Sequence, residues 1–273
     1  MKRKLLALVL YFVLAVTAAL TAFPLLWMVS VSLMQTGEAS AFPPPLWPAA
    51  VTFEHYIELF TSLHMERYLF NSLLLATSVT LLSLLVNAMA GYAFAKLRFP
   101  GRHRLFRTLL AGLVIPAQVA MLPLFLMLKY LGVVNTYAGV IIPGLASIFG
   151  IFLIRQYTLS VPDSLLEAAR IDGASEFGIF RLVVLPLIKP ILVTLAIFTF
   201  MGTWNDFLWP LIVLTDNDLY TLPVALAVFS REHVQDNELM MAGAVMTVLP
   251  VLVVFLALQR YYIQGIMVGS LKG

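Results

Sequence analysis

The sequence contains no cysteine and few charged residues. Its 273 residues include 17 Lys and Arg, 14 Asp and Glu and 4 His, so only 11% of the chain is charged while 61% is hydrophobic. Soluble domains are about 45–50% apolar and about 25% charged, so the composition indicates an integral membrane protein. The formal net charge of +3 gives no reason to expect a nucleic-acid partner.

The missing residue types also exclude several kinds of chemistry. Without cysteine there is no disulfide, thiolate metal ligand or thiol reaction. The phosphate-binding pattern G-x-x-x-x-G-K-[ST] does not occur, so the chain has no visible phosphate-binding loop of its own. If it takes part in an ATP-driven process, another subunit would hydrolyse the ATP. The histidines fall in predicted loops without metal-site spacing, and we interpret them as solvated. The four histidines are His55, His64, His103 and His233. We predict no catalytic residue, no cofactor and no metal site.

Six apolar runs predict an all-α membrane protein with six transmembrane helices in a single domain, residues 1–273. About 17–25 apolar residues are needed to cross the hydrocarbon core as a helix. The first run, Leu5 to Leu33, is longer than the apolar core of a signal peptide, so we expect it to be retained, with a cleaved signal as the alternative. The predicted spans are residues 5–33, 70–95, 107–128, 138–154, 183–204 and 239–259.

Several residues inside or beside these spans have predicted roles. Prolines should kink the third span and interrupt the helical hydrogen bonds at the start of the fifth. Polar side chains of the second span should face protein or water rather than lipid. Trp204 and Trp209 are expected at the membrane interface. The prolines are Pro116, Pro123, Pro186 and Pro190, and the polar residues are Asn71, Ser72, Thr77, Ser78, Thr80, Ser83 and Asn87.

The distribution of charge predicts the orientation. If the loops alternate across the membrane, 14 of the 17 basic residues lie on the side of the two termini, and the other side holds only Arg67, Lys129 and Arg231. Cytoplasmic loops are rich in Lys and Arg, so both termini are predicted to be cytoplasmic.

The most polar stretch, Ser160 to Pro190, follows the fourth span and extends into the start of the fifth. Ser160, three residues before Asp163, is predicted to cap a short helix. Glu167 and Arg170 are placed to form an i,i+3 ion pair, and Gly173 should end the helix in a left-handed conformation. The pattern predicts a helix, a sharp turn and a second helix that enters the membrane.

This stretch resembles the EAA loop of binding-protein-dependent ABC importer permeases, EAA-x3-G-x9-I-x-L-P. The matching residues are Glu167-Ala168-Ala169, Gly173 and Val183-Val184-Leu185-Pro186, with Val in place of the Ile. Together with TWNDFLWPLIVL at 203–214 and the terminal GSLKG, it makes nearly the whole chain similar to sugar permeases of the maltose and glycerol-phosphate type.

The resemblance implies a permease subunit of an ATP-driven importer that moves a sugar across the cytoplasmic (inner) membrane by alternating access. The implied partners are a second permease subunit, a pair of ABC ATPase subunits, an extracytoplasmic sugar-binding protein and the lipid bilayer. A sugar phosphate or polyol is the alternative substrate. An ion-coupled secondary transporter is the alternative of another class, although the intramembrane acids or inverted repeats of such proteins are not visible in the sequence.

The resemblance also assigns roles to single residues. Residues 160–182 would form a cytoplasmic coupling loop that transmits closure of the ATPase pair to the membrane helices. The tail is either a frayed end or a contact with the ATPase, and the outer loop 210–238 is a connector or a contact with the binding protein. The predicted ATPase-coupling residues are Glu167, Ala168, Ala169, Asp172, Gly173, Pro186 and Lys272.

Three amides are candidates for the substrate path. Asn87 and Gln118 lie deep in spans, where they would face either the path or a neighbouring helix. Asn205, with Asp206, follows the fifth span and is more simply interpreted as part of a capping pair, with a role in the path as the alternative.

Overall fold

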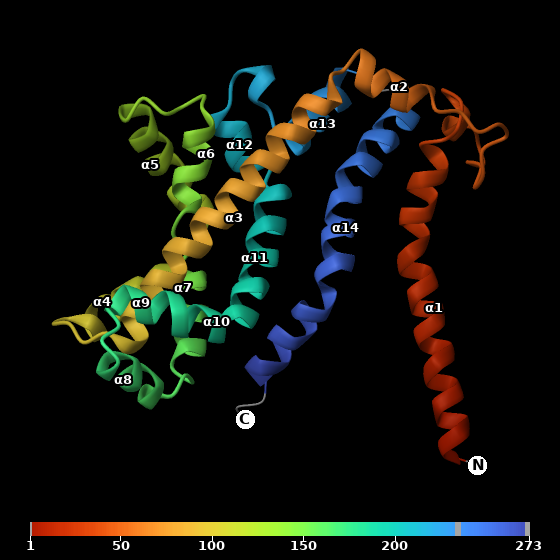
Figure 1. The fold of residues 1–273 in the computed structure, drawn as a ribbon. Coiled ribbons are helices and arrows are strands. Elements are labelled where there is room, and N and C mark those ends of the chain that lie inside the picture. Colours follow the sequence, from red (N-terminus) through yellow and green to blue (C-terminus); the bar gives the residue numbers. More distant parts are fainter. Residues whose placement is uncertain (1, 233–235, 271–273) are drawn as a thin grey trace. The chain divides into compact units, whose positions relative to one another are not determined.

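A computed structural model describes residues 2–232 and 236–270, and within these residues the chain is helical and contains no strand (Figure 1). The predicted all-α class is confirmed. The chain divides into two compact units, one of Met1–Arg67 and Leu222–Pro250 and the other of Tyr68–Thr221 and Val251–Gly273. Two long helices, α3 and α14, run through both.

The first unit contains the apolar helix α1, the segment that follows it, and the first part of α14 with the helix before it. The helix α1 has a mean hydropathy of 2.5 over its apolar window, and none of that window is buried. An apolar surface of this size needs a cover of lipid or protein. Ser30 Oγ donates to the Leu46 carbonyl at 2.6 Å, which fixes the end of α1 to the loop that follows. The elements are α1 (Lys2–Val31), η1 (Glu38–Ser40), α2 (Glu54–Thr61), α13 (Leu222–Glu232) and the first part of α14 (Asn237–Ser270).

The second unit holds most of α3 and the chain from α4 to η4. Its apolar clusters gather around α3, α7 and α11 at one end and around α5, α6 and α12 at the other. The elements are α3 (Met65–Lys96), α4 (Arg102–Ala111), η2 (Gly112–Val114), α5 (Ala117–Tyr130), α6 (Tyr137–Gly144), α7 (Ile148–Thr158), α8 (Asp163–Ile171), α9 (Glu176–Ile179), a π-helical turn η3 (Phe180–Val184), α10 (Leu185–Leu187), α11 (Lys189–Trp204), α12 (Leu208–Val213) and η4 (Asn217–Leu219).

Between four and six stretches of the described chain are long and apolar enough to cross a membrane. Two further pairs of helices reach that length only if each bent pair is one span: Arg102–Val114 with Ala117–Tyr130, bent by 107°, and Glu176–Leu187 with Lys189–Trp204, bent by 79°. The number of six spans therefore stays a prediction. The four single stretches are Arg3–Val31, Met65–Lys96, Tyr137–Thr158 and Asn237–Ala257.

Both bends lie where prolines were expected to disturb the helix. The chain leaves the helical conformation at Ile115, immediately before Pro116, and again at Ile188, between Pro186 and Pro190. A proline cannot donate a helical hydrogen bond, and the residue before it avoids the helical conformation. The break between α6 and α7, at residues 145–147, was not predicted.

The burial of single side chains tests other expectations only in part. Trp204 and Trp209 are buried within the protein, and Trp209 Nε1 donates to the Gly139 carbonyl at 3.2 Å. Their place at a membrane interface stays a prediction. His55 is also buried, against the expectation of a solvated side chain. On α3, Thr77 is exposed. The polar side chains of α3 that are buried, as expected, are Asn71, Ser72, Thr80, Ser83 and Asn87.

Asn71 shows how the polar groups of α3 are satisfied. Its Nδ2 donates to the carbonyls of Asp218 and Tyr220 at 2.9 and 3.0 Å, and its Oδ1 accepts from the Tyr137 hydroxyl at 2.6 Å. Polar groups that face away from water need such partners. This amide therefore joins α3 to α6 and to the turn around η4.

Gly139 permits a close backbone contact within the second unit. A Cβ atom there would lie 2.5 Å from the Val133 carbonyl oxygen and 2.8 Å from a methyl group of Val213. We expect Gly139→Ala to lower the free energy of unfolding by about 1–3 kcal/mol, the usual cost of overpacking. Thermal unfolding in detergent measures this.

Gly202→Ala is the matched control, because nothing lies within 4 Å of a Cβ at that helical position. It should leave the stability unchanged or raise it by up to about 1 kcal/mol. Equal melting temperatures for the two variants would contradict the close contact.

Candidate functional site

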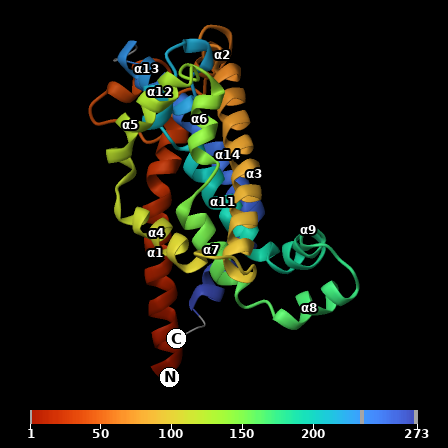
Figure 2. The same cartoon turned by 90° about the vertical axis from the view of Figure 1, so that its left-hand side faces the viewer.

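The candidate site is the segment 160–182, here called the hairpin, which contains α8 and α9 beyond the end of α3 and α7 (Figure 2). Its first helix, α8, begins with Asp163 after Pro162. The predicted cap is wrong: Ser160 Oγ donates to the Tyr157 carbonyl at 2.7 Å and does not cap α8. Proline at the N-cap fixes the chain direction instead, and Asp163 lies in the first turn, where a negative charge is favourable.

The turn after α8 has the predicted left-handed glycine. Gly173 has φ +84°. The amide of Gly173 donates to the Arg170 carbonyl and that of Ala174 to the Ala169 carbonyl, both at 3.0 Å. These two bonds are those of a Schellman motif, which closes the last turn of a helix and reverses the chain. The turn is therefore a defined structure and not a loose connection.

The second helix, α9, is tied to both α8 and α3. Ser175 caps it, with Oγ accepting from the Gly178 amide at 3.2 Å. Glu176 Oε1 accepts from Arg170 Nε at 2.7 Å, and its Oε2 accepts from the Tyr92 hydroxyl on α3 at 2.8 Å. The predicted pair of Arg170 with Glu167 is therefore replaced by an ion pair across the turn.

Lys96, at the end of α3, holds the start of the hairpin. Its Nζ donates to the Val161 carbonyl and to Asp163 Oδ1, both at 2.6 Å. The hydrogen bond and the charge of Lys96 lower the pKa of Asp163. Since the folded chain then binds this proton less readily than the unfolded chain, the pair adds stability above the ordinary pKa of aspartate and loses it as pH falls through the lowered value.

Apolar packing completes the attachment. Leu166 on α8 and Ile179 on α9 are at most 2% exposed, and they share a cluster with Phe180, Val184 and Ile154. One face of α8 thus packs on the helices that enter the membrane. A push on the outer face of α8 would be transmitted to these helices, because close-packed interiors yield little.

The predicted coupling residues lie mostly on the outer face. Ala169 is half-buried against the apolar cluster, and Lys272 lies outside the described residues. Four large apolar side chains of the hairpin are also exposed: Leu165 at 45%, Ile171 at 86%, Phe177 at 64% and Leu182 at 72%. The predicted residues that are exposed are Glu167, Ala168, Asp172, Gly173 and Pro186.

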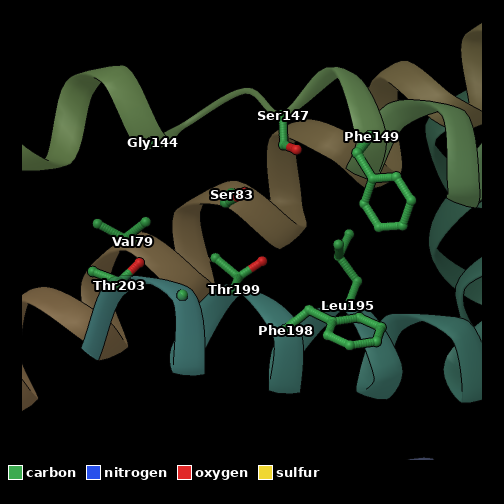
Figure 3. Close-up of a pocket in the computed structure, with 10 residues that line it drawn as sticks. Val79, Ser83, Gly144, Ser147, Phe149, Leu195, Phe198, Thr199 and Thr203 are labelled. Atoms are coloured by element: carbon green, nitrogen blue, oxygen red, sulfur yellow. The ribbon is translucent and has the colours of Figure 1, made fainter. Parts of the chain in front are cut away.

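A separate cavity of about 270 Å³ lies between α3, the α6–α7 break and α11 (Figure 3). Phe149 and Phe198 contribute aromatic rings. Hydroxyl groups come from α3, from the α6–α7 break and from α11, and the other lining side chains are apolar. Small-molecule pockets likewise have a mostly apolar lining with a few polar groups. The residues with hydroxyl groups are Ser83, Ser147, Thr199 and Thr203.

Asn87 lies beside this cavity and holds the helix break. Its Oδ1 accepts from the Ser147 amide at 3.0 Å, and its Nδ2 donates to Ser83 Oγ at 2.7 Å. The side chain is fully buried, and a Cβ at Gly150 would clash with it. Asn87 was predicted to face either the substrate path or a neighbouring helix, and these contacts favour the neighbouring helix.

The other two amides lie elsewhere. Gln118 is exposed in the first turn of α5, and Asn205 is exposed at the end of α11, where its Nδ2 donates to the Met201 carbonyl at 2.8 Å. Asp206 Oδ1 accepts from the Trp209 amide at 3.4 Å at the start of α12. Asn205 and Asp206 thus bond to the backbone at the two helix ends that they join, as the capping interpretation expects.

The sequence analysis missed the residues that anchor the hairpin from α3. Tyr92 and Lys96 are separated from their partners by 84 and 67 residues. Nothing in the local sequence indicates these pairs. The only signal was that both residues lie in the last turns of a span that would end on the same side as the hairpin.

Comparison with known proteins gives a consistent family. The model of the family described as "binding-protein-dependent transport system inner membrane component" matches residues 87–268. The arabinooligosaccharides transport system permease protein AraQ of Halalkalibacterium halodurans is 40% identical over 266 residues, covering 95% of this chain and 94% of that protein. The lactose transport system permease protein LacG of Rhizobium radiobacter is 33% identical over 272 residues, covering 100% and 98%.

The fold also has a solved counterpart. A chain in the crystal structure of a bacterial ABC transporter involved in the import of the acidic polysaccharide alginate matches with a TM-score of 0.85 and 24% identity, covering 96% of this chain and 98% of that one. At this identity the likeness shows the fold, which is that of an ABC transporter permease.

Proposed function

This chain belongs to the family of binding-protein-dependent transport system inner membrane components, and from that premise we propose that it is a permease subunit of an ATP-driven importer that carries a sugar. The similar permeases are named for arabinooligosaccharides and lactose, which supports a sugar substrate here. A sugar phosphate or a polyol is the alternative substrate.

The observation that carries the proposal is the construction of the hairpin. It exposes Glu167, Ala168 and four large apolar side chains, while its inner face is fixed to α3 by Lys96 and Tyr92. Small residues permit close approach of a partner, and exposed apolar groups are typical of a protein interface. The hairpin therefore fits a rigid lever that an ATPase subunit holds from outside.

The partners follow from this role. A pair of ATPase subunits would hold this hairpin and the corresponding one of a second permease, and an extracytoplasmic binding protein would deliver the sugar. The hairpin and both termini would then be cytoplasmic, in a single six-span domain of residues 1–273, as the charge distribution predicts. We place the tail with Lys272, which lies outside the described residues, against the ATPase pair.

The cavity beside Asn87 is our candidate for part of the sugar path. Aromatic rings suit the apolar faces of sugar rings, and hydroxyl side chains can exchange hydrogen bonds with sugar hydroxyls. Its volume of about 270 Å³ is below the about 300 Å³ at which small-molecule pockets begin. We therefore expect it to contact one sugar unit in passage rather than to hold an oligosaccharide.

The coupling role predicts a selective defect. Gly173→Val should strain the left-handed turn, and Glu167→Lys should reverse a charge on the docking face. We expect both variants to insert into the membrane at wild-type levels but to lose about tenfold or more of the sugar uptake and of the ATPase activity stimulated by the binding protein, a loss equivalent to about 1.4 kcal/mol. Reconstituted complexes measure both activities.

Gly132→Val is the matched control. Gly132 also has a left-handed φ, +71°, and open space around a Cβ, but it lies in the turn after α5. The Gly132→Val variant should introduce a similar backbone strain, but it should retain the coupling of ATP hydrolysis to sugar uptake. Wild-type uptake by the Gly173 and Glu167 variants, or an equal loss in the Gly132 variant, would refute the assigned role.

The path role predicts that the cavity can be blocked without disturbing the hairpin. A side chain at Gly202 meets no atom within 4 Å of its Cβ, so leucine there can extend into the cavity that Gly202 lines. We expect Gly202→Leu to reduce sugar uptake about tenfold while the ATPase subunits still copurify, and Gly202→Ala to transport normally. Normal uptake by the leucine variant would remove this cavity from the path.

A further inference from the structure

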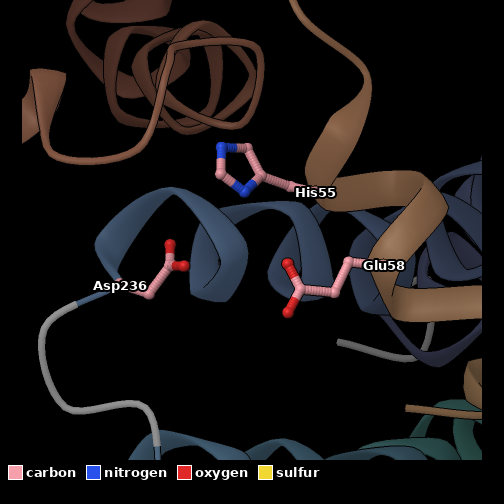
Figure 4. A group of neighbouring side chains, drawn as sticks. All are labelled: His55, Glu58 and Asp236. Carbon is pink, nitrogen blue, oxygen red and sulfur yellow. The ribbon is translucent and has the colours of Figure 1, made fainter. Parts of the chain in front are cut away.

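Three potential metal ligands meet in the first unit, away from the hairpin. His55 and Glu58 lie on α2, and Asp236 immediately precedes α14 (Figure 4). One ligand atom from each residue lies within 4.8 Å of the other two. The two segments are nearly 180 residues apart in the sequence, so the fold alone brings these groups together.

The imidazole of His55 is fixed in an orientation that suits a metal ligand. The side chain is only 2% exposed, and Nε2 lies 3.0 Å from the Met34 carbonyl oxygen. A carbonyl can only accept, so Nε2 carries a proton, and in the neutral ring Nδ1 would be the nitrogen that offers a lone pair to an ion. Figure 4 shows the edge of the ring with Nδ1 turned toward the two carboxylates. Metal-binding histidines commonly donate their other ring N–H to a carbonyl in this way.

The carboxylates approach from different backbone segments. Glu58 is one turn after His55 on α2 and is half-buried. Asp236 Oδ1 accepts from the Leu239 amide at 2.8 Å, so this side chain caps α14 and retains a second oxygen for an ion. The cap by itself explains Asp236 but not the convergence of His55 and Glu58 on it.

Other contacts hold the same segments in place. Glu238 Oε1 accepts from the Ala39 amide at 2.7 Å, and Asn237 Nδ2 donates to Ser40 Oγ at 3.3 Å. The start of α14 is thus already attached to the loop before α2. The backbone near Asp236 is therefore restrained independently of any bound ion.

We propose that His55, Glu58 and Asp236 form a binding site for a divalent transition-metal ion of the Zn²⁺ class. One nitrogen and two carboxylate oxygens suit such ions, whereas Ca²⁺ and Mg²⁺ prefer oxygen ligands alone. Zn²⁺ binds nitrogen and oxygen ligands at about 2.0–2.2 Å, so small side-chain rotations would bring the three atoms together around it. A water molecule would complete the tetrahedron.

The ion would link α2 to the start of α14 within the first unit. Because two carboxylates converge beside one imidazole, the site concentrates negative charge that a bound cation would neutralise. Binding would require a neutral imidazole and ionised carboxylates, so it should weaken in acid. The site is independent of the sugar-transport proposal, since none of its residues belongs to the hairpin or to the cavity beside Asn87.

The test uses the membrane complex that contains the full chain, stripped with a chelator and then titrated with Zn²⁺. Bound zinc is counted by elemental analysis after gel filtration, and the melting temperature is measured with and without the ion. Glu58→Gln and Asp236→Asn remove ligand charge, and asparagine preserves the cap of α14 because it is as good an N-cap as aspartate. Glu54→Gln, an exposed acid one turn earlier on α2, is the matched control.

We expect the wild type and the Glu54 variant to bind one more Zn²⁺ per chain than the two ligand variants, or to bind that ion at least about tenfold more tightly. Zinc should raise the melting temperature only where the ion binds, since a ligand of the native state stabilises it. Equal zinc content and affinity in all four proteins would overturn the proposal. Retention of Ca²⁺ in preference to Zn²⁺ would overturn the assigned class of ion.

Discussion

Glu176 joins three helices, because it lies in the first turn of α9 while its carboxylate accepts one hydrogen bond from Arg170 on α8 and another from Tyr92 on α3. The geometry of the hairpin depends on this carboxylate and on Lys96, which bonds to Val161 and Asp163 at the other end. Two polar anchors, with Leu166 and Ile179 packed between them, make the hairpin an extension of α3. A force on its outer face would then act on the membrane helices.

The helix breaks of the second unit follow one constraint. Away from water, each backbone amide and carbonyl needs a partner, so irregular backbone is stable only where protein satisfies it. At the α6–α7 break the Asn87 side chain accepts from the Ser147 amide. At the start of α11 the break coincides with Pro190, which has no amide hydrogen to satisfy. The cavity lined by Ser147 and Thr199 lies beside the first of these breaks.

Local signals in the sequence predicted the turn of the hairpin and the bend of the third apolar run, although they failed for the cap of α8. Asp172-Gly173 predicted a left-handed helix end, and the Schellman bonds confirm it. Pro116 predicted the bend of the third apolar run in the same way. The helix end at Gly173 and the bend at Pro116 depend on residues adjacent in the sequence, so a short sequence pattern is enough to predict them.

Features that depend on tertiary contacts could not be predicted in this way. Arg170 has Glu167 at helical spacing, yet it pairs with Glu176 because the turn brings that carboxylate within 2.7 Å. Trp204 is buried by neighbouring helices, and the sequence does not identify these helices. The cluster of His55 with Asp236 likewise requires contact between distant segments. The coupling assignment came from the resemblance of the EAA spacing to a family.

The central claim is that the outer face of the hairpin binds an ATPase subunit, and a single introduced cysteine tests it directly. Since the chain has no cysteine, Ala168→Cys, an exposed position, would carry its only thiol. A short thiol-directed crosslinker should join it to a copurifying subunit with a phosphate-binding loop, with a yield that changes when ATP is added, while Gln118→Cys gives no such product. Absence of this product at position 168 in a complex that contains the ATPase would contradict the account.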